Sequence, residues 1–118
     1  MTSILIVDDE ERIRSIYRRV FQKEGFSVEE AAGAGEAYEN MMKKPADVLL
    51  LDIALPDVDG IVLYDIIKTF HKKTRIIVTS VFAVDRQKSL IIGATDYYDK
   101  SESIRILVQK VKASLTVS

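Results

Sequence analysis

Short apolar runs that alternate with helical patterns constrain the fold of this chain more than any other feature. Three runs are typical of buried strands, namely Ser3–Val7, Asp47–Leu51 and Arg75–Thr79, and two weaker candidates are Phe26–Glu30 and Thr95–Tyr98. Strands that are apolar on both faces and are joined by helices form parallel sheets covered on both sides. The pattern therefore predicts an α/β domain in which a βα unit is repeated five times.

The segments between these runs have the apolar spacing of amphipathic helices. The predicted helices are Glu11–Glu24, stopped by Gly25; Glu36–Lys44; Gly60–His71, with Leu63, Ile66, Ile67 and Phe70 on one face; Asp85–Ile92, stopped by Gly93; and a last helix capped by Ser101, with Ile104, Leu107, Val108, Val111 and Leu115 inward.

Length, charge and cysteine content exclude several classes of protein. A chain of 118 residues fits one domain, which we expect to span residues 1–118. The net charge of −1 provides no basic field for nucleic acid or an anionic membrane. The lack of cysteines excludes disulfides and thiolate metal sites. No signal-peptide pattern or membrane-length apolar run is present, so we expect a cytoplasmic protein.

Polar residues follow the strands at the points where the apolar runs end. Asp8 and Asp9 follow the first run and Asp52 follows the third. Thr79 ends the fourth, and Lys100 follows the fifth. Active sites of parallel α/β sheets lie beyond the carboxyl ends of the strands. The order predicts that these groups, contributed by four separate segments, meet at one rim of the sheet.

Three carboxylates at one rim require a proton or a cation, because each pair at 4 Å repels by roughly 4 kcal/mol at an effective dielectric of about 20. Oxygen ligands suit a hard cation, and this set suits Mg²⁺. An aspartate can attack phosphorus to form an acyl phosphate. Lys100 and the hydroxyl of Thr79 could then contact phosphoryl oxygens, and before transfer Lys100 would pair with Asp52 or Asp8.

Each piece also has a plain structural interpretation when it is taken alone. An acidic pair after a strand is more often a solvated turn or a helix cap, Thr79 a sheet-end residue and Lys100 a surface charge. Their ordered combination at successive strand ends favours the functional interpretation, because nothing in an apolar core requires it.

The segments ILIVDDE, VLLLDIALPDVDGI, RIIVTS and GATDYYDK resemble the receiver domains of two-component response regulators, which include the chemotaxis response regulator. The resemblance covers essentially the whole chain. It implies a single (βα)5 flavodoxin-like domain with a five-stranded parallel sheet of order 2-1-3-4-5. It also implies a signalling switch, not an enzyme, that catalyses only its own phosphorylation and dephosphorylation.

The resemblance further assigns residues and partners. Asp52 matches the phosphoacceptor, and Asp8 and Asp9 match the acid pair that holds Mg²⁺, with Asp9 and Asp52 as direct ligands. The backbone carbonyl of Ala54 matches the third protein ligand. The remaining matches are Thr79 as the switch hydroxyl, Lys100 as the family's lysine and Tyr97 as the aromatic that changes rotamer. The implied donor is a phosphohistidine on a sensor kinase or phosphotransfer protein, and the output partner or fused effector domain stays open.

Three features depart from the family pattern. Ser101 stands where the family usually has a proline in a cis peptide, which leaves the shape of the last loop open. The spacings from Asp52 to Thr79 and from Thr79 to Lys100 are about one residue short, so Ser80 is an alternative switch hydroxyl, although Thr79 is favoured. Val81 and Phe82 make the loop after the fourth strand unusually apolar.

Rival interpretations remain. Asp57–Gly60 has the D-x-D-G letters of a haloacid dehalogenase phosphatase, but in a turn, and an EF-hand loop over 55–66 has the wrong end residues. Gly33–Gly35 lacks the G-x-G-x-x-G pattern of a nucleotide site. His71 is interpreted as solvated. A pseudo-receiver that acts as an unphosphorylated interaction module is the main alternative.

Overall fold

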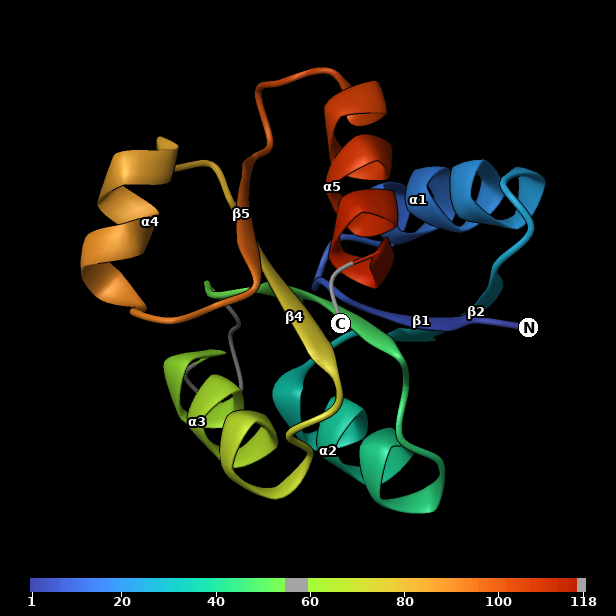
Figure 1. Ribbon diagram of the computed structural model, residues 1–118, viewed down its shortest axis with the longest axis horizontal. Coiled ribbons are helices and arrows are strands. Elements are labelled where there is room, and N and C mark those ends of the chain that lie inside the picture. The colour runs from blue at the N-terminus through green and yellow to red at the C-terminus, as the bar shows by residue number, and fades with distance from the viewer. Residues whose placement is uncertain (55–59, 117–118) are drawn as a thin grey trace.

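The computed structural model describes residues 1–54 and 60–116 (Figure 1). In chain order its elements are β1 (Ser3–Val7), α1 (Glu11–Lys23), β2 (Ser27–Ala31), α2 (Ala34–Lys43), β3 (Val48–Asp52), α3 (Gly60–Phe70), β4 (Arg75–Ser80), α4 (Val84–Leu90), β5 (Asp96–Asp99) and α5 (Ile104–Thr116). The predicted alternation of strands and helices is confirmed, with boundaries shifted by one or two residues at most ends.

The five strands form one parallel sheet with the order β2-β1-β3-β4-β5. Helices α1 and α5 lie on one face of the sheet, α2 and α3 on the other, and α4 lies beside β5 (Figure 1). This is the flavodoxin-like arrangement expected from the sequence. Because every strand runs in the same direction, the carboxyl ends of all five meet at one rim.

Successive side chains of a strand point to opposite faces of a sheet, and the buried residues accordingly form two clusters. The cluster on the side of α1 and α5 includes Ile6, Leu50, Ile77, Phe21 and Leu107. The cluster on the side of α2 and α3 includes Val7, Leu51, Val78, Met41 and Ile67. Full burial of one such side chain stabilises the fold by about 1.5–3 kcal/mol, so these two layers fix the sheet that carries the rim.

The start of the last helix differs from the prediction. The N-cap of α5 is Ser103, whose Oγ accepts a hydrogen bond of 3.2 Å from the backbone N–H of Arg105. Ser101 instead donates its hydroxyl to Oδ1 of Asp99. The backbone N–H of Glu102 donates to the carbonyl of Asp99 at 2.9 Å, so a turn separates β5 from the helix and moves the cap two residues further along the chain.

One apolar side chain expected in the core is on the surface. Phe70 is 75% exposed, because it is the last residue of α3, where the chain turns toward β4. Tyr64 is buried beside Leu63 and Ile67. Its hydroxyl can be buried because it donates a hydrogen bond of 3.2 Å to the carbonyl of Ile92.

The predicted glycine stops are confirmed. Gly25 follows α1 with φ 93°, and Gly93 follows α4 with φ 89°, a backbone region that favours glycine. Within residues 1–54 and 60–116, no helix has the length and apolar content needed to cross a membrane.

Candidate functional site

The carboxyl ends of two neighbouring interior strands, β1 and β3, carry the buried acids of the site. Asp8 directly follows β1, and Asp52 is the last residue of β3. Their residues are 1% and 4% exposed, whereas Asp9 is exposed. One carboxylate oxygen from each of Asp8, Asp9 and Asp52 lies within 4.8 Å of the others. The predicted convergence of the three acids at the rim is therefore confirmed.

Lys100 bridges the two buried carboxylates. Its Nζ lies 2.7 Å from Oδ2 of Asp8 and 3.0 Å from Oδ2 of Asp52, so the predicted pairing occurs with both acids at once. Burial alone would lower the pKa of Lys100, but the hydrogen bonds and charges of Asp8 and Asp52 outweigh it and raise that pKa above its ordinary value. The lysine is thus a fixed positive charge inside the acidic cluster.

Backbone donors orient the same two carboxylates. The N–H of Glu10 donates to Oδ1 of Asp8 at 2.9 Å, and the N–H of Ala54 donates to Oδ1 of Asp52 at 3.0 Å. In both acids, Oδ1 accepts a hydrogen bond from the backbone N–H two residues further along the chain, and Oδ2 contacts Nζ of Lys100. The charge-assisted bonds fix the acids more firmly than neutral bonds would.

Thr79 lies opposite Asp52 in the neighbouring strand. The β3–β4 register pairs Asp52 with Thr79, and side chains at paired positions of a sheet point to the same face. Ser80 is one residue further and points to the other face. Its Oγ accepts a hydrogen bond of 3.1 Å from the backbone N–H of Phe82. The alternative hydroxyl of Ser80 is thus used by the loop between β4 and α4.

The loop after Lys100 has its own side-chain closure. The N–H and hydroxyl of Ser101 both donate to Oδ1 of Asp99, at 2.8 and 2.7 Å. These two bonds lower the pKa of Asp99, the backbone bond more than the side-chain bond. The described residues contain no cis peptide bond. Ser101, in the position of the family's usual proline, therefore forms a turn closed by Asp99.

Tyr97 and the apolar loop lie on the side of α4. The ring of Tyr97 belongs to the cluster that also includes Ile91, and Phe82 packs against that cluster while half-buried. Val81 is 74% exposed. The guanidinium of Arg86 lies 4.2 Å from the ring centre of Phe82. Of the two apolar loop residues noted in the sequence, one is therefore packed and the other faces solvent.

The structure adds two positions near the site that the sequence did not reveal. A Cβ on Gly60 would lie 2.7 Å from Cα of Ile53 and 2.9 Å from the carbonyl oxygen of Asp52, so α3 begins against the backbone next to the acid. Tyr17 of α1 is buried, and burial, with weaker contributions from the charges of groups that include Asp8 and Asp52, raises the pKa of its phenol. The glycine at the start of a helix pattern was the only available signal for Gly60.

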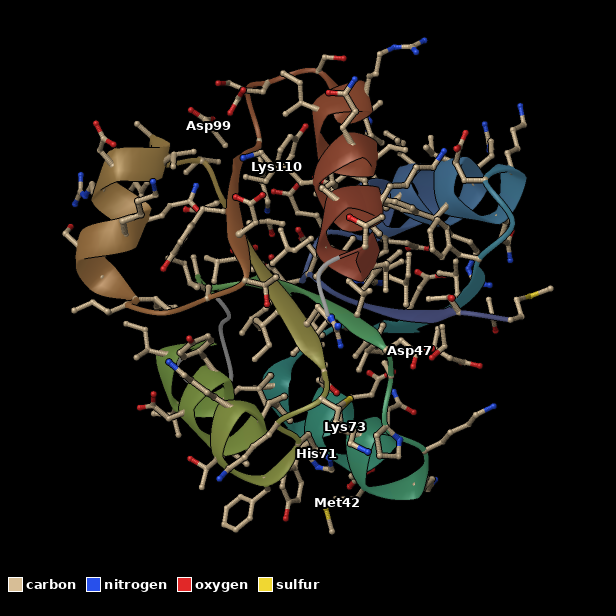
Figure 2. The ribbon with its side chains drawn as sticks, in the orientation of Figure 1. Met42, Asp47, His71, Lys73, Asp99 and Lys110 are labelled. Atoms are coloured by element: carbon tan, nitrogen blue, oxygen red, sulfur yellow. The ribbon has the colours of Figure 1, made fainter. Side chains whose placement is uncertain are left out.

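His71, the one histidine of the sequence, does not contribute to this rim. It lies at the opposite end of the molecule from Asp99, which ends β5 (Figure 2). Residues 57–59 of the phosphatase-like D-x-D-G, and residues 55–59 of the EF-hand-like segment, lie outside the described residues.

The donor set fits a hard divalent cation. The three acids of the cluster offer carboxylate oxygens, and Mg²⁺ prefers oxygen ligands and is usually bound through one or two carboxylates plus waters and phosphate oxygens. The ammonium of Lys100 lies at the same rim, so the site combines a place for a cation with a fixed positive charge. Such a pair of charges can stabilise the equatorial oxygens of a transferring phosphoryl group.

Comparison with known proteins places the chain in a family. The model of the response regulator receiver domain matches residues 4–112. The transcriptional regulatory protein SrrA of Staphylococcus aureus is 40% identical over 114 residues, which are 95% of this chain and 47% of that protein. The chain therefore spans about half the length of this curated relative.

Solved structures agree with the sequence comparison. A CheY-like receiver domain protein from Methanospirillum hungatei JF-1 is 32% identical with a TM-score of 0.89, over 98% of this chain and 94% of that one. Response regulator TrrA from Thermotoga maritima, in complex with Mg²⁺-BeF, is 30% identical with a TM-score of 0.88, over 97% and 99%. With its sheet order and its acidic rim, the chain belongs to the response regulator receiver domains, the signalling switches of two-component systems.

Proposed function

We propose that this chain is a phosphorylation switch in which Asp52 accepts a phosphoryl group from a phosphohistidine on a sensor histidine kinase or phosphotransfer protein. The observation that carries the proposal is the position of Lys100, whose Nζ lies 3.0 Å from Asp52 and 2.7 Å from Asp8. A buried ion pair contributes little net stability compared with apolar packing. The presence of a buried ion pair here, with its cost of desolvation, is better explained by a role in binding a phosphoryl group than by a role in stabilising the fold.

The proposed Mg²⁺ ligands are carboxylate oxygens of Asp9 and Asp52 and the backbone carbonyl of Ala54, with Asp8 as the further acid of the pair. When bound, the cation neutralises charge on the phosphoryl oxygens. The proximity of the three carboxylates supports this assignment, and so does the similarity to TrrA, which was solved with Mg²⁺-BeF.

The proposed transfer forms one bond and breaks another at phosphorus. A carboxylate oxygen of Asp52 attacks, the P–N bond to the donor imidazole breaks, and its electron pair stays on that nitrogen. Lys100 exchanges its contact with Asp52 for one phosphoryl oxygen, and the hydroxyl of Thr79 donates to another. The strand register, which places Thr79 beside Asp52, supports Thr79 over Ser80 in this role. Hydrolysis later releases inorganic phosphate and restores the carboxylate.

The modification acts on the rest of the domain through its charge. A phosphoryl group adds roughly −1.5 to −2 charges and strong acceptor oxygens. Thr79 moves toward them and Tyr97 responds, so that the face made by α4, β5 and α5 changes its partner affinity. A shift from 1:99 to 99:1 needs about 5.5 kcal/mol of differential stabilisation, more than one hydroxyl and one lysine contact supply, and partner binding provides the rest.

Three broader assignments belong to the same proposal. The chain acts as one receiver domain over residues 1–118, in the cytoplasm, where two-component kinases present their phosphohistidine. Its only catalysis is its own phosphorylation and dephosphorylation. Because SrrA is a transcriptional regulatory protein about twice the length matched here, an effector domain in the same protein or a separate output partner would read the switch.

Intact-mass measurement after incubation with acetyl phosphate and Mg²⁺ tests the proposal. The wild type should gain one phosphoryl group, Asp52→Asn should gain none, and Asp65→Asn, which changes an exposed acid on α3, should match the wild type. Equal uptake by wild type and Asp52→Asn would exclude Asp52 as the acceptor. No uptake by any of the three would favour the pseudo-receiver.

A further inference from the structure

Helix α4 is attached to the sheet by a buried amide. Of its seven residues only Gln87 is buried, with 0% of its surface exposed. A surface helix normally buries a stripe of apolar side chains, and a buried polar side chain is stable only when it is hydrogen-bonded. The attachment of α4 therefore depends in large part on the bonds that Gln87 makes, because its other core contact, Val84, is only partly buried.

Those bonds connect two different segments. Nε2 of Gln87 donates to the carbonyl oxygen of Phe82 at 2.8 Å, in the loop between β4 and α4. It also donates to the carbonyl oxygen of Tyr98 at 2.9 Å, in β5. Both amide hydrogens are thus used, while Oε1 finds no hydrogen-bond partner within the described parts of the chain. Two carbonyls fix which end of the amide faces them, because only the nitrogen can donate.

The two segments are those that carry Thr79 and Lys100. The N–H of Phe82 donates to Oγ of Ser80, the residue after Thr79. The carbonyl of Ser80 accepts a bond of 2.8 Å from the N–H of Lys100. Tyr98 is the register partner of Thr79 in the β4–β5 pair. Gln87 therefore closes a ring of hydrogen bonds that links the segment directly after Thr79 to the backbone of Lys100.

We propose that Gln87 is a positioning residue of the switch, which fixes the separation of the Thr79 and Lys100 segments and transmits its change to α4. A movement of the loop that displaces the Phe82 carbonyl breaks one of the two bonds that hold the helix. Gln87 is the one fully buried side chain of α4, and Val84 packs against the core while only partly buried, so that loss weakens the attachment of the helix and lets it shift. The inference rests on the proposed phosphorylation of Asp52 for its signalling meaning.

Gln87→Met tests the proposal, because methionine keeps the length of the side chain and removes both donors. The matched control is Lys88→Met, which changes an exposed residue of the same helix whose Nζ lies 6.0 Å from the ring centre of Tyr97. Three measurements are made on each folded protein: amide hydrogen exchange across α4 by NMR, Mg²⁺ affinity, and affinity for beryllofluoride in the presence of Mg²⁺.

In Gln87→Met the α4 amides should exchange about tenfold faster, as expected for the net loss of two neutral hydrogen bonds. Mg²⁺ affinity should equal that of the wild type, since the acids are held by other segments. Beryllofluoride affinity should fall about fivefold or more, the low end of couplings between sites. Lys88→Met should leave all three unchanged. If Gln87→Met does not fold, Gln87→Leu, which also removes both donors, must show the same pattern.

Wild-type beryllofluoride affinity in the Gln87 variant, or an equal loss of Mg²⁺ and beryllofluoride affinity, would overturn the positioning role. An equal acceleration of exchange in Lys88→Met would also overturn it. If the wild type itself neither binds beryllofluoride nor gains mass with acetyl phosphate, the proposed function fails. If instead the wild type binds beryllofluoride and the Gln87 variant binds it equally well, only the positioning role fails.

Discussion

The phenol hydroxyl of Tyr97 donates a hydrogen bond of 2.6 Å to the backbone carbonyl of Ile91, directly after α4. The same oxygen accepts a bond of 3.2 Å from the N–H of Ala94. Tyr97 is 7% exposed, so its ring points inward. The resemblance to receiver domains implies that this is the aromatic residue that changes rotamer. The hydroxyl therefore holds the turn between α4 and β5 against the end of the helix.

Tyr97→Phe should lower the free energy of unfolding by about 1–2 kcal/mol, because the buried carbonyl of Ile91 loses its donor while the ring still fills its space. Urea denaturation followed by far-UV circular dichroism measures the change. Tyr38→Phe, on a ring that is 42% exposed, is the control and should change stability by less than about 0.5 kcal/mol. Equal stabilities of wild type and Tyr97→Phe would contradict the role of the hydroxyl.

Gly60→Ala should destabilise the domain by about 1–3 kcal/mol. The new methyl group would lie 2.7 Å from Cα of Ile53 and 2.9 Å from the carbonyl oxygen of Asp52, both of them backbone atoms that a rotamer change cannot move. Alanine is the better helix former by about 1 kcal/mol, so a loss of stability would be due to the collision. Thermal unfolding measures the change, and Asp65→Ala, at an exposed position of the same helix, is the control. A Gly60→Ala variant more stable than the wild type would show that the start of α3 can move away from the backbone of Asp52 and Ile53.

The sequence predicted the sheet and the rim because both depend on residue patterns that are local in the chain. Runs such as Leu49–Leu51 are apolar at every position, and that property identifies a strand covered on both faces. Asp8 and Asp52 were found because the ends of those runs are sharp. Once the strands are parallel, topology alone brings these acids together.

The features that the sequence did not reveal depend on contacts between distant segments. Gln87 has the appearance of an exposed helical residue, and only the two carbonyls of Phe82 and Tyr98 show why it is buried. Ser101 and Ser103 are both plausible caps, and the choice depends on whether Asp99 captures the first of them. No periodicity in a single sequence encodes these pairings.

Lys100→Met should destabilise the domain by about 3 kcal/mol, because it leaves the carboxylates of Asp8 and Asp52 buried at the rim without the lysine ammonium that contacts both. Asp52→Asn should recover part of that loss when it is combined with Lys100→Met, since one of the two repelling charges is gone. Urea unfolding of the four proteins forms a double-mutant cycle, with an expected coupling of about 1–3 kcal/mol. Additive effects would mean that the two side chains do not interact in solution.

Mg²⁺ should raise the melting temperature, and EDTA should reverse the effect. At a concentration one hundred times its dissociation constant, a ligand that binds only the folded state adds about 2.7 kcal/mol. Asp9→Asn should weaken this stabilisation, because Asp9 is a proposed ligand but is exposed and is not one of the acids that Lys100 bridges. Asp65→Asn should keep the full Mg²⁺ effect. An unchanged Mg²⁺ effect in Asp9→Asn would remove that carboxylate from the ligand set.

Stability should decline above about pH 10, and Tyr17 should account for part of the decline. Burial raises the pKa of Tyr17 well above its ordinary value of 10.0. At a pH between 10.0 and the pKa of Tyr17 in the folded state, the unfolded chain has released the phenol proton while the folded chain retains it. The stabilisation is therefore complete below pH 10 and is lost as the pH rises toward the folded-state pKa, by up to about 1.4 kcal/mol per pH unit for one proton.

Urea unfolding between pH 8 and pH 11 should give a shallower decline for Tyr17→Phe than for the wild type. Tyr38→Phe, at an exposed ring, should keep the wild-type slope. Parallel declines for wild type and Tyr17→Phe would show that this phenol ionises at the same pH in the folded and unfolded chains, which would contradict its burial beside the acidic rim.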